Sequence, residues 1–217
     1  MPDVIDHLKI MNNALSRIAA GSIMAEDEDT DLAAQTVPVY YDRLDAVLAM
    51  YGWTFAGKTY KLDRVGETVE NGYVTADTKF MNGWRYGFAL PGNRVGEPRR
   101  VLDNPRRPDY PFRDFLIEGG NLYADRDELW ATVTVRPDPI VWRPDFRLAL
   151  TCLVAADLCI PVTHDQRLAE ALFQQGEGSP SEQGRGGLIG RAIAADAASA
   201  PAKAPLHNTP LTDARFM

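Results

Sequence analysis

The chain has 217 residues, of which 45% are hydrophobic and 24% are charged, and its net charge is −7. This length allows one sizeable domain with a packed core, or a domain that carries an inserted subdomain. So acidic a chain is a poor candidate for tight, non-specific DNA binding, which needs basic surface to displace counterions. No apolar run approaches the roughly 18 residues that a membrane span needs, so we expect no membrane partner.

The first 52 residues predict two helices. Apolar residues recur near helical spacing over 3–20, and Gly21 is a stop signal. A second helix is expected to run to about Met50, with Pro38 inside it. Pro38 should kink or split this helix, because proline lacks an N–H and clashes with the preceding turn. Carboxylates crowd the start of the second helix, where the helix dipole favours them: Glu26, Asp27, Glu28, Asp29 and Asp31.

The middle of the chain, from about 53 to 143, has the texture of a β-rich region. Aromatic and β-branched residues alternate with polar ones, and Gly and Pro recur every few residues. The expected strands are Lys58–Leu62, Tyr73–Lys79, Arg85–Leu90, Asp114–Glu118, Asn121–Ala124 and Leu129–Val135. The sequence Glu118-Gly119-Gly120-Asn121 predicts a hairpin turn. Residues 91–112 hold five prolines and five arginines, and we expect them to form a long exposed loop.

The pattern of residues predicts helices again from residue 144 onward. Residues 144–160 predict an apolar, central helix that begins with Pro144 and ends at Pro161. The further expected elements are a helix from Thr163 or His164 through Gln175, a linker over 176–181 and a weaker helix over 183–198. Residues 199–217 hold three prolines and little bulk, which predicts an extended or disordered arm.

These patterns together predict an α+β fold. Helices from both ends of the chain, residues 1–52 and 144–198, should form a helical bundle. Residues 53–143 would be inserted into it as a small antiparallel β subdomain, and residues 199–217 would follow as an extended C-terminal arm.

The residue types that carry out catalysis or bind metals do not occur at the spacing typical of a catalytic or metal site. Residues 27–31 resemble the start of a calcium loop, but Leu32 and Pro38 stand where such a loop needs Gly and Glu. The histidines lack metal-ligand partners at useful spacing. The glycine-rich run 184–190 lacks the Gly-Lys-Ser/Thr ending of a phosphate loop. We therefore expect a protein that is not an enzyme and that has no cofactor or metal site.

The two cysteines, Cys152 and Cys159, lie seven residues apart in one apolar stretch. Seven residues span about 10 Å of helix, which is too far for a disulfide within one helix. We expect two reduced core thiols in a protein made in a cytosol. The N-terminus fits this expectation, because it has no apolar stretch of the kind found in secretory signals.

A cluster of arginines begins at residue 94 and ends at residue 113. Its members are Arg94, Arg99, Arg100, Arg106, Arg107 and Arg113, with acidic residues interspersed. Two interpretations stay open: a solvated loop, or a docking surface for an acidic partner or the DNA backbone. The second interpretation supports an alternative function, a nucleic-acid-binding module that uses the arginine-rich loop 94–113.

Three stretches carry a resemblance to a known family. The first is Asn13-Ala14-Leu15-Ser16-Arg17-Ile18, followed by the acidic residues and a long helix. The second is Gly52-Trp53-Thr54-Phe55-Ala56, followed by Tyr86-Gly87-Phe88-Ala89-Leu90-Pro91. The third is Trp142-Arg143-Pro144-Asp145-Phe146, followed by Ile160-Pro161-Val162-Thr163-His164-Asp165. In this order and spacing, over roughly residues 10–198, the chain resembles the tail tubular protein A and head–tail adaptor proteins of tailed phages and gene transfer agents.

The resemblance implies a structural role at the head–tail junction of a virion made in the bacterial cytoplasm. Such adaptors form rings, commonly of twelve copies, below the portal protein. They extend the channel through which viral DNA passes without sequence-specific binding, and they dock the next tail, stopper or nozzle protein. The C-terminal segment often reaches the portal, which makes Leu206, Leu211 and Phe216 candidate partner-binding residues alongside the arginines. The carboxylates at 26–31 become candidates for facing the channel.

Overall fold

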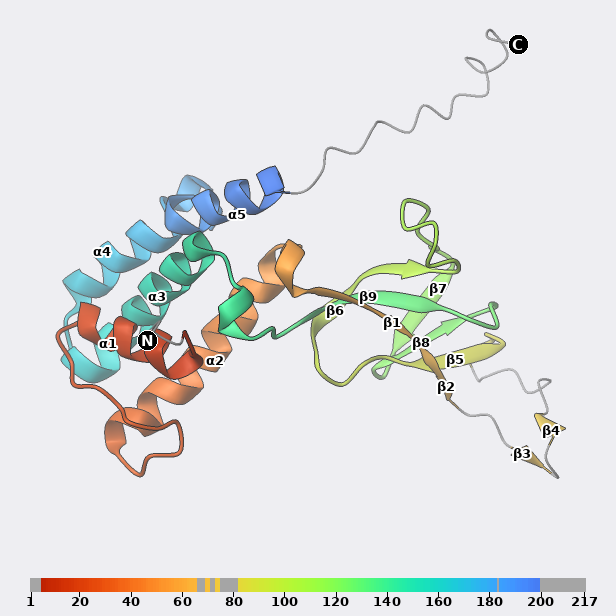
Figure 1. The fold of residues 1–217 in the computed structure, drawn as a ribbon, viewed down its shortest axis with the longest axis horizontal. Coiled ribbons are helices and arrows are strands. Elements are labelled where there is room, and N and C mark those ends of the chain that lie inside the picture. The colour runs from red at the N-terminus through yellow and green to blue at the C-terminus, as the bar shows by residue number, and fades with distance from the viewer. Residues whose placement is uncertain (1–4, 66–68, 71–72, 75–81, 183, 200–217) are drawn as a thin grey trace, which may run out of the picture.

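The computed structural model describes residues 5–65, 69–70, 73–74, 82–182 and 184–199. Its elements form two lobes that lie side by side along the longest axis of the molecule (Figure 1). The helical lobe comprises residues 5–56 and 139–199, and the β lobe comprises the described part of 57–138. The predicted α+β fold is therefore confirmed.

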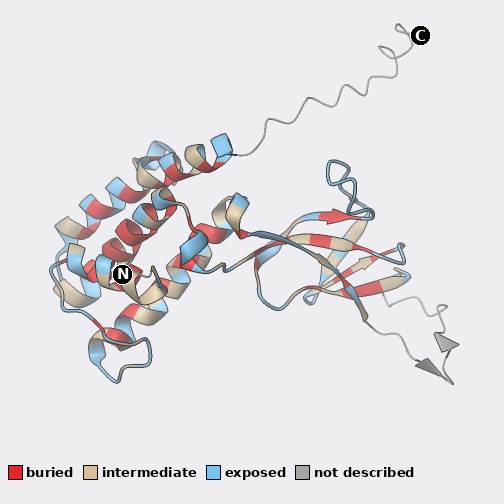
Figure 2. Cartoon of the chain, in the orientation of Figure 1, coloured by how far each residue is buried: buried red, intermediate tan, exposed pale blue. Residues whose placement is uncertain are grey.

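One central helix organises the helical lobe. The helices are α1 (His7–Arg17), α2 (Asp31–Met50), α3 (Pro144–Leu158), α4 (Gln166–Glu177) and α5 (Gly187–Ser199). Helix α3 packs against each of the other four and is buried along most of its length (Figure 2). Its apolar character on nearly all sides explains this position, because a helix without a polar face is stable only when it is surrounded.

Side-chain caps begin three of these helices. The Asp6 carboxylate accepts a hydrogen bond from the Lys9 amide at 2.7 Å, and the Thr30 hydroxyl accepts one from the Ala33 amide at 3.2 Å. Asp165 does the same for the Leu168 amide at 3.0 Å. Each cap satisfies an amide that has no partner within its own helix, which fixes where the helix begins.

The β lobe contains two antiparallel sheets and one short antiparallel pair of strands. The first sheet has the order β1 (Gly57–Lys61), β9 (Trp130–Val135), β6 (Arg94–Leu102); the second has the order β2 (Asp63–Val65), β5 (Tyr86–Ala89), β8 (Asn121–Ala124), β7 (Phe115–Glu118). Strands β3 (Val69–Glu70) and β4 (Tyr73–Val74) pair with each other. Phe88 and Leu122 are the largest fully buried side chains between the strands.

The strand predictions are largely confirmed. The expected hairpin joins β7 to β8, with Glu118 paired to Asn121 and both intervening glycines at positive φ, 58° and 82°. Glycine adopts these angles without the steric cost that a side chain would add. Strand β4 confirms the start of the strand expected over Tyr73–Lys79, whose residues 75–79 lie outside the described part of the chain. Strands β2 and β3 were not predicted.

The long loop expected over 91–112 is wrong in its first half, because strand β6 occupies Arg94–Leu102. Gly96, at φ 72°, and Pro98 lie in a bulge where the register with β9 shifts between Val95 and Arg100. The bulge accommodates the glycine and the proline that suggested a loop, since an unpaired residue needs no ladder hydrogen bond.

Three predicted helix boundaries also need correction. Pro38 does not split α2, which runs unbroken from Asp31 to Met50. Both Pro38 and Ala34 are exposed, so water can satisfy the carbonyl that the missing N–H leaves free. Helix α1 ends before Gly21, with Ala19 at φ 55°. Pro161 does not end the central helix, because a π-helical turn, η3, carries it from Cys159 to Thr163.

The expectation that no apolar run approaches the length of a membrane span is wrong for the central helix. Residues Pro144–Thr163 form a 20-residue segment with a mean hydropathy of 1.7, long and apolar enough to span a bilayer by those measures alone. In this structure 61% of that stretch is buried inside the protein. The segment is the core of the helical lobe, and Cys152 and Cys159 are buried free thiols within it, as expected.

Candidate interaction surfaces

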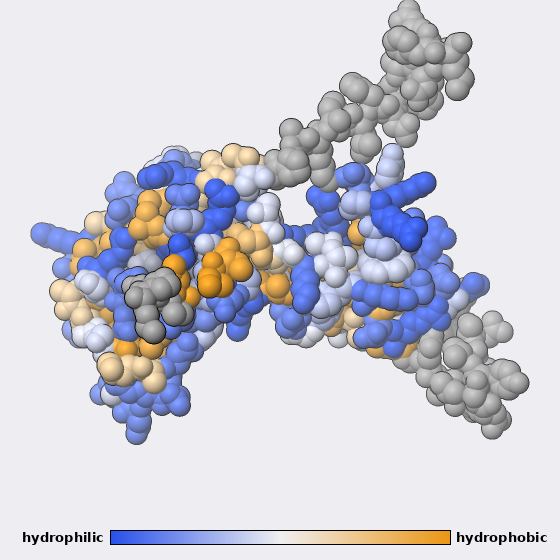
Figure 3. Space-filling model, in the orientation of Figure 1, coloured by the Kyte–Doolittle hydropathy of each residue, from blue (hydrophilic) through white to orange (hydrophobic). Residues whose placement is uncertain are grey.

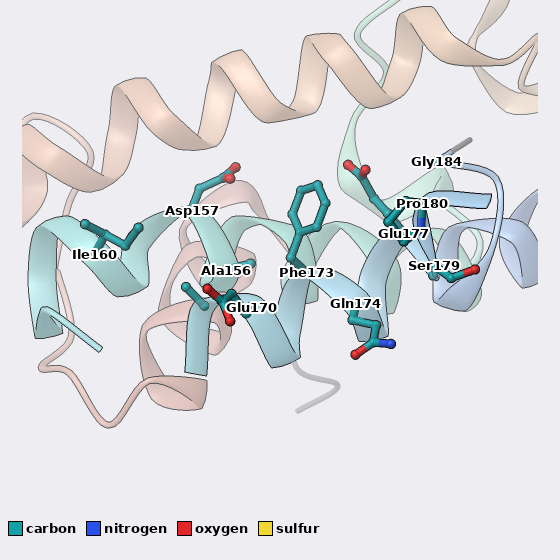
Figure 4. Close-up of a pocket in the computed structure, with 12 residues that line it drawn as sticks. Ala156, Asp157, Ile160, Glu170, Phe173, Gln174, Glu177, Ser179, Pro180 and Gly184 are labelled. Atoms are coloured by element: carbon teal, nitrogen blue, oxygen red, sulfur yellow. The ribbon is translucent and has the colours of Figure 1, made fainter. Parts of the chain in front are cut away.

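An apolar groove of about 570 Å³ lies between α3, α4 and the turn that follows α4 (Figure 4). Ala156, Ile160 and Phe173 supply its apolar wall. Ile160 is 57% exposed and Phe173 is 43% exposed, although both are large apolar side chains. A groove of this size with exposed apolar walls is typical of a site that another molecule covers.

Three carboxylates border the groove, and an arginine holds two of them. Arg43 of α2 donates to both oxygens of Asp157 at 2.5 and 2.6 Å, and to Glu177 at 3.0 Å. Burial alone would lower the pKa of Arg43, but these carboxylates raise it above its ordinary value. Glu170, the third carboxylate, is exposed and accepts a hydrogen bond from Gln166 at 2.9 Å. The groove thus combines apolar contact surface with excess negative charge.

Glycines let the elements around the groove approach closely. A Cβ added to Gly176 of α4 would lie 2.4 Å from a methyl carbon of Leu153 in α3. Gly178, at φ 84°, ends α4 and turns the chain toward Ser179, whose amide binds the Glu182 carboxylate at 2.7 Å. A larger residue at position 176 would push α4 away from α3, so the groove depends on this glycine.

Two of the clustered arginines are structural. Arg99 donates to the Trp53 carbonyl at 2.8 Å and to the Thr134 hydroxyl at 2.8 Å, so it joins the helical lobe to the β lobe. Burial lowers the pKa of Arg99. Arg94 lies half-buried in β6 and donates to the Pro91 carbonyl at 3.4 Å.

The other clustered arginines lie on the surface. Arg100, Arg106, Arg107 and Arg113 are all exposed. Arg106 and Arg107 lie within the connection 103–111, which also holds Tyr110, 53% exposed, and Arg100 and Arg113 flank it. The face of the β lobe shown in Figure 3 is largely hydrophilic. Tyrosine and arginine are enriched where proteins bind one another, so this connection remains a candidate docking surface.

Residues 24–30, together with Asp31 at the start of α2, form an acidic connection between α1 and α2, which we name the acidic loop. Glu28 accepts a hydrogen bond from the Met24 amide at 2.6 Å, and Glu26 accepts one from the Tyr41 hydroxyl at 2.7 Å. Burial, together with Glu26, raises the pKa of Tyr41 to about 12. The Met24 side chain is 80% exposed beside these carboxylates. The candidate residues Leu206, Leu211 and Phe216 lie outside the described residues.

A second hollow, of about 450 Å³, lies between α1 and α3, and we name it the basic pocket. Among the residues that the structure describes, its lining contains three cationic residues and no carboxylate: Ile5, Lys9, Ile10, Asn13, Arg17, Arg147, Leu148 and Thr151. The sequence analysis did not single out this pocket, because its two sides lie about 130 residues apart. The spacing of Lys9, Asn13 and Arg17 at four-residue intervals was the available signal, since it places them on one helix face.

No cluster of three or more His, Cys, Asp or Glu side chains could hold a metal ion within the described ranges. No protein-family model matches this chain, and a comparison with curated proteins gives no significant match.

Proposed function

We propose that this chain is a structural ring subunit that joins the head of a phage or phage-like particle to its tail. The observation that carries the proposal is the number of separate binding surfaces on one small chain. The helical lobe presents an apolar groove, a basic pocket and an acidic loop, and the β lobe presents exposed arginines around Tyr110. A ring subunit needs such a distribution, because it contacts two neighbours and the components above and below it.

Each surface then has a role in the assembly. The helical lobe would pack against neighbouring copies around the ring, and the β lobe would face a neighbour or the next tail component. We assign the apolar groove to a partner segment of apolar and basic side chains, since carboxylates border its apolar wall. Residues 199–217 would bind the portal.

Electron microscopy of the particle that contains this chain tests the proposal. It should show an axial ring of copies at the head–tail junction. A chain located elsewhere in the particle, or copies that surround no axial channel, would overturn it. Deleting residues 200–217 should leave a folded subunit that no longer binds the portal, whereas portal binding at wild-type strength would contradict the role of the arm.

A gel-shift series with duplex DNA at increasing salt separates this function from a nucleic-acid-binding module. The isolated subunit should bind weakly or not at all, because its net charge is −7. Tight binding that weakens with salt and disappears in Arg106→Glu/Arg107→Glu would favour the nucleic-acid module instead.

A further inference from the structure

Two oppositely charged surfaces lie on the helical lobe. The acidic loop contains five carboxylates and no cation, and the described residues that line the basic pocket include three cations and no carboxylate. Arg17 and Arg147 make no ion pair in the described part of the chain, and neither do Asp27 and Asp29. Within the described residues, these two arginines and these two aspartates are therefore available to pair across a contact between copies.

The two surfaces lie on different sides of α1. Asn12 fixes the residue that precedes the acidic loop, because its side-chain amide both donates to and accepts from the backbone of Ile23 at 2.9 Å. Arg17 lines the basic pocket. At about 100° per residue, the pocket residues at positions 9, 13 and 17 lie roughly 60°, 100° and 140° around α1 from Asn12, so the pocket is on a different flank of the helix from the loop. The loop of one chain is thus positioned for a neighbour and not for its own pocket.

Apolar side chains accompany the charges on both surfaces. Met24 is 80% exposed in the acidic loop, and Leu148 is 41% exposed at the basic pocket, where Ile5 and Ile10 also contribute. Methionine is unbranched and flexible, so it fills irregular apolar hollows well. The two surfaces match in apolar contact as well as in charge.

We propose that the acidic loop of one copy docks in the basic pocket of the next copy, with Met24 against Leu148 and the carboxylates of Asp27 and Asp29 facing Arg17 and Arg147. The contact rests on the proposed ring function and specifies its lateral interface. It is head-to-tail, because two different surfaces meet, and such contacts propagate from copy to copy and form a ring when the rotation between copies closes. It also places these carboxylates between subunits, which revises the expectation that they face the channel.

A disulfide cross-link tests the contact even where association of the isolated chain is weak. The double variant Met24→Cys/Leu148→Cys should give a ladder of covalent oligomers under mild oxidation, while each single variant gives dimers at most. The native thiols are buried and do not compete. Tyr110→Cys/Leu148→Cys is the matched control, since position 110 is also exposed and measures random collision. A ladder no stronger than that of the control overturns the proposal.

Charge reversal provides an independent measurement by sedimentation. Arg17→Glu/Arg147→Glu and Asp27→Lys/Asp29→Lys should each weaken self-association by about tenfold or more, because like charges then face one another. A chain with all four changes should associate again, and so should an equimolar mixture of the two variants. Arg106→Glu/Arg107→Glu, with the same change in net charge, should leave association unchanged.

These experiments distinguish a failure of the proposed contact between copies from a failure of the proposed adaptor function. Loss of association that neither the four-change chain nor the mixture restores would overturn the contact, as would retention of wild-type association by both variants. Pocket variants that lose affinity for duplex DNA but not for one another would assign the pocket to phosphate groups instead. An axial ring without a 24–148 cross-link would refute only this interface, whereas a cross-linked ladder from a particle without a ring would refute only the adaptor function.

Discussion

The two lobes are stabilised in different ways. The helical lobe has a continuous core in which the ring of Phe146 contacts Trp53, Phe55 and Trp142 at centroid distances of 4.8, 5.0 and 5.1 Å. The β lobe has a smaller apolar cluster around Phe88, and some of its cations lie over partly buried aromatic rings, as Arg64 does over Tyr86 at 4.6 Å. We infer from this contrast that the helical lobe contributes most of the free energy of unfolding.

A small joint couples the lobes. Val95 of β6 belongs to the core of the helical lobe, and Arg99 binds the Trp53 carbonyl across the boundary. Arg136 donates to both oxygens of Asp45 in α2 at 2.5 and 2.6 Å and lies over the ring of Tyr41. Since both arginines bridge the lobes, their substitution shows how far the lobes unfold together.

Removing the central aromatic ring should give the largest effect. Phe146→Ala is expected to lower the free energy of unfolding by about 3 to 5 kcal/mol, because it leaves a cavity in a fully buried site. Phe88→Ala is the matched variant in the β lobe. Denaturant unfolding followed by circular dichroism should show loss of helix in the first variant and retention of helix in the second. Equal loss of helix in both would contradict a separation of stability between the lobes.

Breaking the ion pairs of Arg43 should have the next largest effect. Arg43→Met leaves Asp157 and Glu177 without their cation beside the groove, and we expect it to cost about 2 to 3 kcal/mol. Arg43→Lys keeps the charge but not the two-pronged contact with Asp157, so its cost should be smaller. The same denaturant measurement checks both. A fully stable Arg43→Met variant would show that this cluster does not hold α2, α3 and α4 together.

The two lobes also differ in how far the sequence predicted them. Strands β7, β8 and β9 were predictable because alternation and the Gly119-Gly120 turn act locally. The roles of Arg99 and Arg94 were not, because a charged residue near glycine and proline indicates a loop unless its distant partner is known. The spacing of cations on α1 indicated only one side of the basic pocket, because its other side lies on the distant helix α3. The groove forms between the consecutive helices α3 and α4, but a helical pattern does not show which apolar side chains stay uncovered. Ile160 and Phe173 fit a helical core pattern equally well, and only their exposure identifies them as surface.

The joint between the lobes should be more sensitive at Arg99 than at Arg136. Arg99 is half-buried, so Arg99→Met should cost about 1 to 3 kcal/mol by removing its hydrogen bonds to the Trp53 carbonyl and the Thr134 hydroxyl. Arg136→Met removes a more exposed ion pair and should cost no more than about 1 kcal/mol. Comparing the unfolding midpoints of the two variants checks the order. A larger cost at Arg136 would place the main coupling at α2 instead of at the Trp53 segment.

The smallest expected effect is a pH dependence at His7, where the helical lobe buries an ionisable ring. The His7 Nδ1 atom is 2.8 Å from the Tyr40 hydroxyl, and the ring packs against Tyr41 and Trp142. Burial lowers the pKa of His7, although Glu26, Asp138 and Asp6 oppose the shift. The unfolded chain, with a histidine pKa of about 6.5, therefore binds the proton more readily than the folded chain.

Stability should accordingly fall as the pH drops through about 6.5, by less than about 1 kcal/mol because the ring is only half-buried. Unfolding of wild type and His7→Asn between pH 7.5 and 5 would isolate this contribution. His164→Asn is the matched control, since His164 is exposed and asparagine tolerates its φ of 56°. If wild type and His7→Asn lose stability in parallel over this range, the carboxylates and not His7 govern the acid sensitivity of the helical lobe.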